Sequence, residues 1–355
     1  MSFDAVQAVN RLLIAAVDRR ASDLHVEPVA DGYEARLRVD GLLQPIESFS
    51  PPDGRSIVLR LMVLAKLLTY RLDVPQEGRA NWSDGAHDAL PLRISVIPTA
   101  RGLRAAVRLP AELSQPRSLD GLGLPAPLVG ALDEYARGSA GMLIVCGPAG
   151  SGKTTAAYAL LERIARLQPG SSLITIEDPV ERQLAGVTQI EVAHHGEMTF
   201  DRALRSVVRQ DPQVLLLGEV RDAESARIAV NAALSGHRLI CTLHAADGAG
   251  AILRLIEMNI EPFRIAGSLW GVLNLRLVRR RTADGYAGRI PLAEMVRLDD
   301  GLREALMRGA SVDAMRLAIA QQVGCGTLMD VARRFVETSV TDREEIERVL
   351  GPGCW

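Results

Sequence analysis

The chain has 355 residues, of which 48% are apolar and 24% charged, a composition typical of a globular protein with two or three domains. A formal net charge of −2 argues against binding of nucleic acid or anionic lipid through overall charge. The four cysteines lie far apart without a CxxC pair, which argues against a cysteine zinc site. Cys146 and Cys241 lie in apolar runs that predict buried strands, which fits a reducing compartment, so we expect a cytoplasmic protein. The longest apolar stretch is too short to span a bilayer.

Residues 1–110 predict a small α+β domain. Apolar residues at helical spacing predict a first helix before Arg20, and a second helix is expected near Ser56–Leu68. Alternating apolar and polar residues predict strands at Tyr33–Val39, Leu92–Ile97 and Ala105–Leu109. Residues 111–127 are rich in proline and glycine, so they predict a linker and a candidate hinge.

Residues 128–355 predict an α/β domain, because short apolar runs alternate with helical segments. Unbroken apolar strands separated by helices favour a parallel sheet covered on both faces. The expected strands are Met142–Cys146, Leu173–Ile176, Val214–Leu217 and Leu239–Leu243. The expected helices are Lys153–Leu167, Phe200–Arg209, Ala223–Leu234 and Ala249–Met258. From about residue 262 onward the pattern predicts a wholly helical region.

A complete GxxxxGK[ST] motif follows the first of these strands and opens the first of these helices. Its glycines let consecutive backbone N–H groups turn toward one anion, and the helix N-terminus adds a partial positive charge. The motif predicts bound ATP, with Lys153 at the β- and γ-phosphates and the Thr154 hydroxyl on Mg²⁺. The expected cofactor-binding residues are Gly147, Pro148, Ala149, Gly150, Ser151, Gly152, Lys153, Thr154 and Thr155.

Two of the predicted strands end in carboxylates. Glu177 ends the strand at 173–176, with Asp178 and Glu181 nearby, and Glu219 follows the strand at 214–217, with Arg221 close behind. Carboxyl ends of parallel strands face the ligand crevice of an α/β sheet. We therefore expect Glu177 to hold Mg²⁺ or orient water, and Glu219 to polarise or position the attacking water. The plain alternative for the first group is a solvated loop of acids.

Two histidines flank the last predicted strand. His244 ends that strand, so it is expected at the same sheet edge as the glutamates, where it can sense the γ-phosphate and signal to the next helix. His237 follows the preceding helix. Neither histidine has metal-ligand spacing to a second histidine or a cysteine, which argues against zinc. Asp222 is expected simply to cap a helix.

Together these motifs resemble the secretion superfamily ATPases, which include type II secretion motors, type IV pilus extension and retraction motors, and conjugation relatives. The resemblance is carried by the segments at residues 21–28, 75–79, 147–154, 177–181, 209–222, 235–237 and 242–244. It implies a RecA-like P-loop NTPase core with a parallel sheet, plus a smaller N-terminal α+β (PAS-like) domain. It also implies ATP hydrolysis with Mg²⁺.

The resemblance implies a homo-hexameric ring docked on an inner-membrane platform protein, so that membrane association is indirect. A nucleic-acid partner is not expected, because no basic stripe or aromatic platform is present. The resemblance further implies that Arg93 and Arg108 reach the phosphates across a domain or subunit boundary. An arginine suits this role because its guanidinium stays charged and binds phosphate oxygens as a fork. Surface arginines without a ligand are the alternative.

The chain also departs from the family pattern. Ala245 and Ala246 replace a usual polar pair, and the run Asn274-Leu275-Arg276 replaces a usual alanine-glutamine-arginine run. The first signature is closer to secretion and pilus-assembly members, whereas the chain length is that of a retraction motor. Three hypotheses follow: an ATP-hydrolysing hexameric motor for type II secretion or pilus assembly, a pilus retraction ATPase, or a non-hydrolysing regulatory ring subunit.

Overall fold

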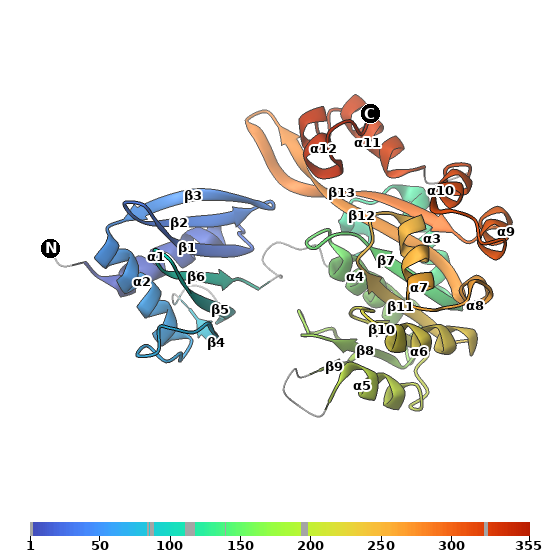
Figure 1. The fold of residues 1–355 in the computed structure, drawn as a ribbon, viewed down its shortest axis with the longest axis horizontal. Helices are drawn as coiled ribbons and strands as arrows, with labels where there is room; N and C mark the ends of the chain where they lie inside the picture. The colour runs from blue at the N-terminus through green and yellow to red at the C-terminus, as the bar shows by residue number, and fades with distance from the viewer. Residues whose placement is uncertain are drawn as a thin grey trace. The chain divides into compact units, whose positions relative to one another are not determined.

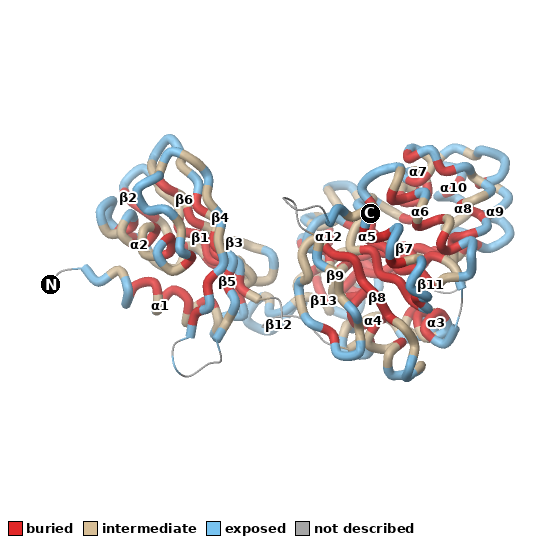
Figure 2. The backbone as a smooth tube through the Cα atoms, turned by 90° about the horizontal axis from the view of Figure 1, so that it is seen from below, coloured by how far each residue is buried: buried red, intermediate tan, exposed pale blue. Residues whose placement is uncertain are grey.

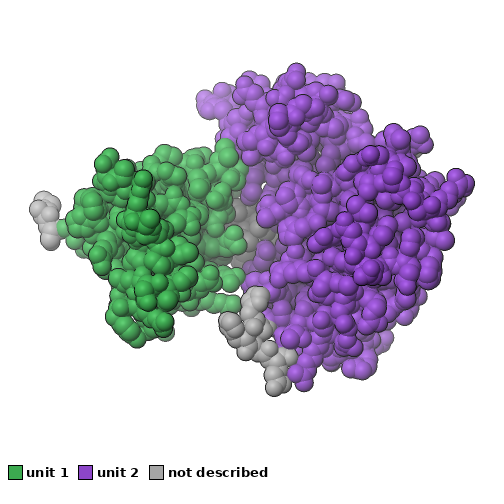
Figure 3. All heavy atoms as spheres, in the orientation of Figure 1, with its two compact units in different colours: residues 1–115 green, residues 116–355 purple. Residues whose placement is uncertain are grey.

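The computed structural model of the chain describes residues 3–83, 85, 89–110, 118–138, 140–192, 198–322 and 326–355. The chain divides into two compact units, residues 1–115 and residues 116–355, each with its own sheet (Figure 3). The first part of the expected linker, residues 111–117, lies outside the described residues. Among the helices of the described ranges, none has the length and apolar character needed to cross a lipid bilayer.

The first unit is a six-stranded antiparallel sheet with two helices on one face. Its strands, in the order β3-β2-β1-β6-β5-β4, are β1 (Asp23–Val29), β2 (Gly32–Val39), β3 (Leu42–Phe49), β4 (Gln76–Trp82), β5 (Leu90–Thr99) and β6 (Gly102–Arg108). Its helices are α1 (Ala5–Asp18) and α2 (Pro51–Leu64). In β2, β5 and β6, alternate apolar residues are buried beneath these helices, and the residues between them lie on the opposite, more exposed face.

The second helix begins earlier than the apolar pattern predicts. Ser50 caps its N-terminus by accepting a hydrogen bond from the Asp53 N–H, and prolines fill the first helical positions. Proline is well tolerated there because the first N–H groups of a helix have no intrahelical partner. The local α+β character was predictable, whereas strands β1, β3 and β4 were not expected.

The second unit contains a seven-stranded sheet in the order β13-β12-β7-β11-β10-β8-β9 (Figure 1). Its strands are β7 (Gly141–Cys146), β8 (Leu173–Glu177), β9 (Thr188–Glu191), β10 (Val214–Leu217), β11 (Arg238–Leu243), β12 (Leu269–Thr282) and β13 (Gly285–Arg297). Every neighbouring pair is parallel except β12 with β13. The expected parallel α/β core is therefore confirmed.

Helices cover both faces of this sheet, and its strands are buried throughout the centre (Figure 2). One face is covered by α3 (Ala126–Ala136) and α4 (Lys153–Leu167). The other is covered by α5 (Phe200–Val207), α6 (Ala223–Leu234), α7 (Gly248–Glu257), α8 (Pro262–Ser268), α9 (Asp300–Met307) and α10 (Val312–Ala320). The helices α11 (Leu328–Glu337) and α12 (Arg343–Leu350) pack on the far part of the β12–β13 hairpin.

The prediction of a wholly helical region after residue 262 is wrong. Strands β12 and β13 form a long antiparallel hairpin there, and β12 adds to the central sheet. Asn274 on β12 lies opposite Cys146, the last residue of β7. An apolar run cannot by itself reveal whether a distant strand offers it an edge, so this pairing was not readable from local periodicity.

Candidate functional site

The phosphate-binding motif forms the turn between β7 and α4. Gly147, Gly150 and Gly152 have φ angles of 148°, 73° and 92°, in the region that favours glycine. A Cβ on Gly147 would lie 2.4 Å from the carbonyl oxygen of Leu275 and 2.5 Å from Ser151 Oγ. Gly147 is therefore required for close approach of the loop to β12. Open space surrounds the Cα of Gly150, where a ligand can approach the backbone.

Lys153 and Ser151 make this loop suitable for an anion. The Lys153 Nζ donates to the carbonyls of Gly147 and Pro148, each at 2.9 Å, so the ammonium lies over the loop. Burial lowers the pKa of Lys153, while the nearby Glu219 carboxylate opposes that shift. The buried Ser151 Oγ has no hydrogen-bond partner within the described ranges. A phosphate group would satisfy both side chains, so these residues fit a bound triphosphate.

Thr154, in the first turn of α4, is the first side chain after the loop that could hold a metal ion. Its hydroxyl donates to Glu181 Oε1 at 3.2 Å. A hydroxyl and a carboxylate are hard oxygen ligands of the kind that Mg²⁺ prefers. No group of three or more His, Cys, Asp or Glu side chains in the described part of the chain could hold a metal by itself. A Mg²⁺ ion at Thr154 and Glu181 would therefore need phosphate oxygens and water as its remaining ligands.

Glu177 has different contacts from those expected of a metal ligand. It is buried, and its carboxylate accepts hydrogen bonds from Tyr158, from Thr175 at 2.5 Å and from Gln189 at 3.1 Å. The Tyr158 hydroxyl also accepts from the Glu181 N–H at 3.2 Å. Sequence reasoning assigned the metal to Glu177, whereas the carboxylate that contacts Thr154 belongs to Glu181, and Glu177 holds the tyrosine that supports it.

Tyr158 is a site residue that sequence reasoning missed. It lies one helical turn after Thr154 on α4, so its side chain leaves the same face of the helix. Burial, reinforced by the hydrogen bond to Glu177, raises the pKa of Tyr158, which keeps the hydroxyl protonated and donating. The spacing from the motif threonine was the only signal in the sequence.

The strand tips of β8, β10 and β11 bring a second charged group together. Glu219 accepts from Arg221 Nε at 2.6 Å and pairs with His244 Nε2 at 3.1 Å. Arg221 also lies 3.5 Å from Asp178. The predicted placement of Glu177, Glu219 and His244 at one sheet edge is observed, since Glu177 ends β8 and Glu219 pairs with His244. Asp178 lies beside this group through Arg221.

His237 is not part of this group within the chain. It precedes β11, at the end of the strand opposite His244, and its Nδ1 lies 3.0 Å from the Ala232 carbonyl. Because β11 (Arg238–Leu243) spans about 20 Å, His237 and His244 lie at opposite edges of the sheet. The expected helix cap at Asp222 is confirmed, because its carboxylate accepts from the Ser225 N–H at 2.8 Å at the start of α6.

Arg93 and Arg108 are direct cross-strand neighbours on β5 and β6 of the first unit, on the face away from the helices. Both are exposed. Arg108 Nε donates to Asp23 at 3.2 Å, and Arg38 lies 3.5 Å from the same carboxylate. Whether these arginines reach the phosphates depends on how the two units meet, so that role stays a prediction.

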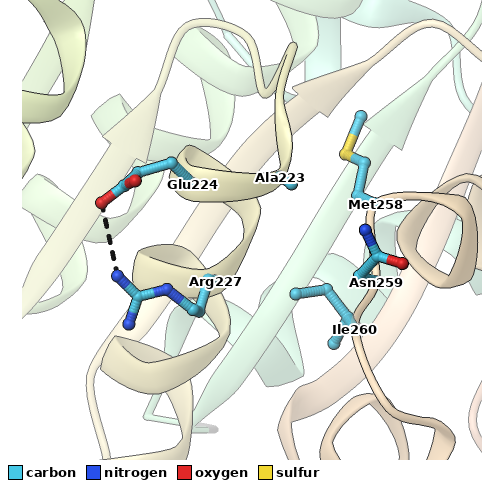
Figure 4. A pocket seen from close by; sticks show the side chains of 6 residues that line it. All are labelled: Ala223, Glu224, Arg227, Met258, Asn259 and Ile260. Atoms are coloured by element: carbon cyan, nitrogen blue, oxygen red, sulfur yellow. Dashed lines mark hydrogen bonds and ion pairs between the residues drawn. The ribbon is translucent and has the colours of Figure 1, made fainter.

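A shallow pocket lies between the first turn of α6 and the turn after α7 (Figure 4). It is lined by Ala223, Glu224, Arg227, Met258, Asn259 and Ile260. Glu224 and Arg227 form an exposed ion pair at 3.3 Å across one side of it. None of the predicted site residues lines this pocket, so it is separate from the phosphate loop.

The sequence profile of the family described as "Type II/IV secretion system protein" matches residues 4–348. The chain belongs to that family. It is 35% identical to the type II secretion system protein HxcR of Pseudomonas aeruginosa, over 97% of this chain and 77% of that protein. It is 33% identical to the type IV pilus assembly ATPase PilB of Thermus thermophilus, over 96% of this chain and 42% of that longer protein.

The fold is also that of a solved structure. The pilus retraction motor PilT with bound ADP superposes with a TM-score of 0.70 at 24% identity and covers 97% of both chains. The predicted P-loop ATPase of the secretion superfamily, with its α/β core, is thereby confirmed. Nucleotide binding follows from the family.

Proposed function

We propose that this chain is the motor ATPase of a type II secretion or type IV pilus assembly system and hydrolyses ATP at the 147–154 loop. The main support is the meeting of phosphate-binding and acidic groups at one sheet edge: Lys153 and Thr154 from the loop, Glu181 beside Thr154, and Glu219 beside His244. Relatives at 33–35% identity carry secretion or assembly names, which favours those two systems over retraction.

Each residue of the site has a separate role in phosphoryl transfer. Backbone N–H groups of the loop and Lys153 would bind the phosphates, and Thr154 with Glu181 would hold the metal. When bound there, Mg²⁺ would supply positive charge that offsets the charge of the phosphates. Glu219 orients the attacking water, while Arg221 and His244 fix the direction of its carboxylate. Glu177 acts through Tyr158, which supports the Glu181 backbone.

The mechanical part of the proposal concerns several copies of the chain. A homo-hexameric ring in the cytoplasm, docked on an inner-membrane platform protein, would convert closure of each nucleotide site into movement. Arg93 and Arg108 would complete a site by adding positive charge to the phosphates, because an arginine on a separate unit makes hydrolysis depend on closure. The membrane is then reached through the platform protein.

Phosphate release by the full chain and its Glu219→Gln variant tests the chemical part. Glutamine keeps the shape but loses the charge that orients water, so turnover should fall at least about a hundredfold, while binding of a labelled ATP analogue changes little. Glu257→Gln, an exposed carboxylate on α7, is the matched control and should keep wild-type turnover. Equal turnover of wild type and Glu219→Gln would remove Glu219 from the mechanism and favour a regulatory, non-hydrolysing subunit.

A further inference from the structure

A buried polar cluster lies directly behind the phosphate loop, on β12 and β13. Asn274 is fully buried and Glu294 nearly so, and Arg276 lies two residues beyond Asn274 on the same strand. Because Asn274 is paired with Cys146, this part of β12 runs beside the start of the loop. Polar side chains at such depth need partners, so their contacts show what they hold in place.

Arg276 connects the loop wall to the turn that follows β11. Its Nη1 donates to Asn274 Oδ1 at 3.1 Å and to the Leu275 carbonyl at 2.9 Å. Its Nη2 donates to the Ala246 carbonyl at 2.5 Å. Ala246 is two residues after His244, so one guanidinium fixes the backbone that carries this histidine.

The residues at both ends of the Arg276 contacts, Asn274 and the turn after His244, are held by further hydrogen bonds. Asn274 Nδ2 donates to Glu294 Oε2 at 3.2 Å, which ties β12 to β13. On the other side of the turn, Asp247 caps α7 through the Gly250 N–H at 2.6 Å. The cluster therefore sets the position of β12 relative to the residues that follow His244.

The His244 ring has little else to position it. Its side chain is 51% exposed, and the 3.1 Å pair with Glu219 is its one polar contact in the described ranges of the chain. A half-exposed ring with one partner depends on its backbone for its average position. A small displacement of the 244–247 turn would therefore separate His244 from Glu219.

We propose that Arg276 is a positioning residue for hydrolysis: it holds the Ala246 carbonyl so that His244 stays against Glu219. This inference rests on the proposed role of Glu219 in orienting water. Displacement of a reacting group by about 1 Å can cost on the order of a hundredfold in rate. Loss of the Arg276 contact should therefore reduce turnover more than it reduces nucleotide affinity.

Steady-state phosphate release over a range of ATP concentrations, by the full chain, tests the proposal. Arg276→Gln should lower kcat about tenfold and change KM for ATP less than about twofold, since the phosphate-binding groups are untouched. Arg276→Lys keeps a charged donor but loses the forked guanidinium that reaches both Asn274 and Ala246. Its kcat should therefore fall about threefold. Arg254→Lys, an exposed arginine on α7, is the control and should behave as wild type.

A double-mutant cycle with His244→Ala separates positioning from a general structural role. If Arg276 acts through His244, adding Arg276→Gln to His244→Ala should cost less than about twofold more in kcat. An additional tenfold loss in that background, or wild-type kcat for Arg276→Gln alone, would overturn the proposal. Should Arg276→Gln fail to fold by circular dichroism, Arg276→Lys takes its place in the cycle: no further loss of kcat in the His244→Ala background supports the proposal, and the full loss of about threefold there overturns it.

The two proposals fail differently in these experiments. If Glu219→Gln keeps wild-type turnover, the proposed function is lost, and the role of Arg276 is lost with it. If Glu219→Gln is inactive but Arg276→Gln matches wild type, only the positioning role of Arg276 is lost.

Discussion

The two sheets of this protein carry their functional charges in different places. In the second unit the charged side chains gather at strand ends, where Glu219 and His244 meet beside the phosphate loop. In the first unit they lie across strands, where Arg93 and Arg108 are neighbours on one face. The carboxyl ends of parallel strands lie at one edge of the sheet, so chain order alone predicts the first arrangement. The second requires the register of the strands, and its function requires a second surface.

The largest expected effect concerns the cross-strand arginines. Arg108→Ala should lower turnover on the order of a hundredfold, because an arginine that completes a phosphate site from another unit contributes at least that much. Arg38→Ala removes a different arginine beside the same Asp23 carboxylate and should change turnover little. Phosphate release by both variants makes the comparison. Equal rates for Arg108→Ala and wild type would show that this face acts elsewhere than at the nucleotide.

An intermediate effect on turnover is expected from Tyr158 and Glu177, which support Glu181 at the sheet edge. If Glu177 acts through Tyr158, then Tyr158→Phe and Glu177→Gln should both slow turnover about tenfold, because each releases the support of the Glu181 backbone. Single-turnover hydrolysis by the two variants measures this. Near wild-type rates for Tyr158→Phe together with a severe loss for Glu177→Gln would instead return the metal or water to Glu177.

The smallest effect on catalysis is expected from a buried charge on α12, which is neither at the strand edge nor on the arginine face. Glu345 on α12 is buried and accepts from Arg279 of β12 and from Arg348. Burial alone would raise its pKa, but hydrogen bonds from Arg348 and Arg279 outweigh burial and lower the pKa of Glu345 to about 2. Glu345→Gln should lose about 2 kcal/mol of unfolding free energy while turnover at low temperature is unchanged.

The same carboxylate gives stability a defined dependence on pH. Its pKa is lower in the folded state, at about 2, than its ordinary value of 4.5, so the unfolded state takes up the proton first. Its contribution is therefore complete above about pH 4.5 and is lost as the pH falls toward 2. Denaturant unfolding of wild type and Glu345→Gln at several pH values should show the two stabilities converge in acid. A constant difference would contradict this assignment.

Much of the second unit was predictable from local pattern. The helices Lys153–Leu167 and Ala223–Leu234 and the strand Val214–Leu217 have the predicted bounds. The phosphate loop, Glu219 and His244 were also predicted at one edge. Strand β9 and the β12–β13 hairpin were missed, because each becomes a strand by pairing with a distant segment rather than through its own periodicity.

The sequence by itself determined the phosphate loop and the sheet edge at which its partners stand. Both follow from contiguous residues and from the common direction of parallel strands. Only the tertiary structure decided that Glu181 rather than Glu177 contacts Thr154, that His237 stands apart, and that Arg276 holds the turn after His244. Those outcomes depend on which donors, far apart in the chain, surround each side chain after folding, and no spacing rule contains that information.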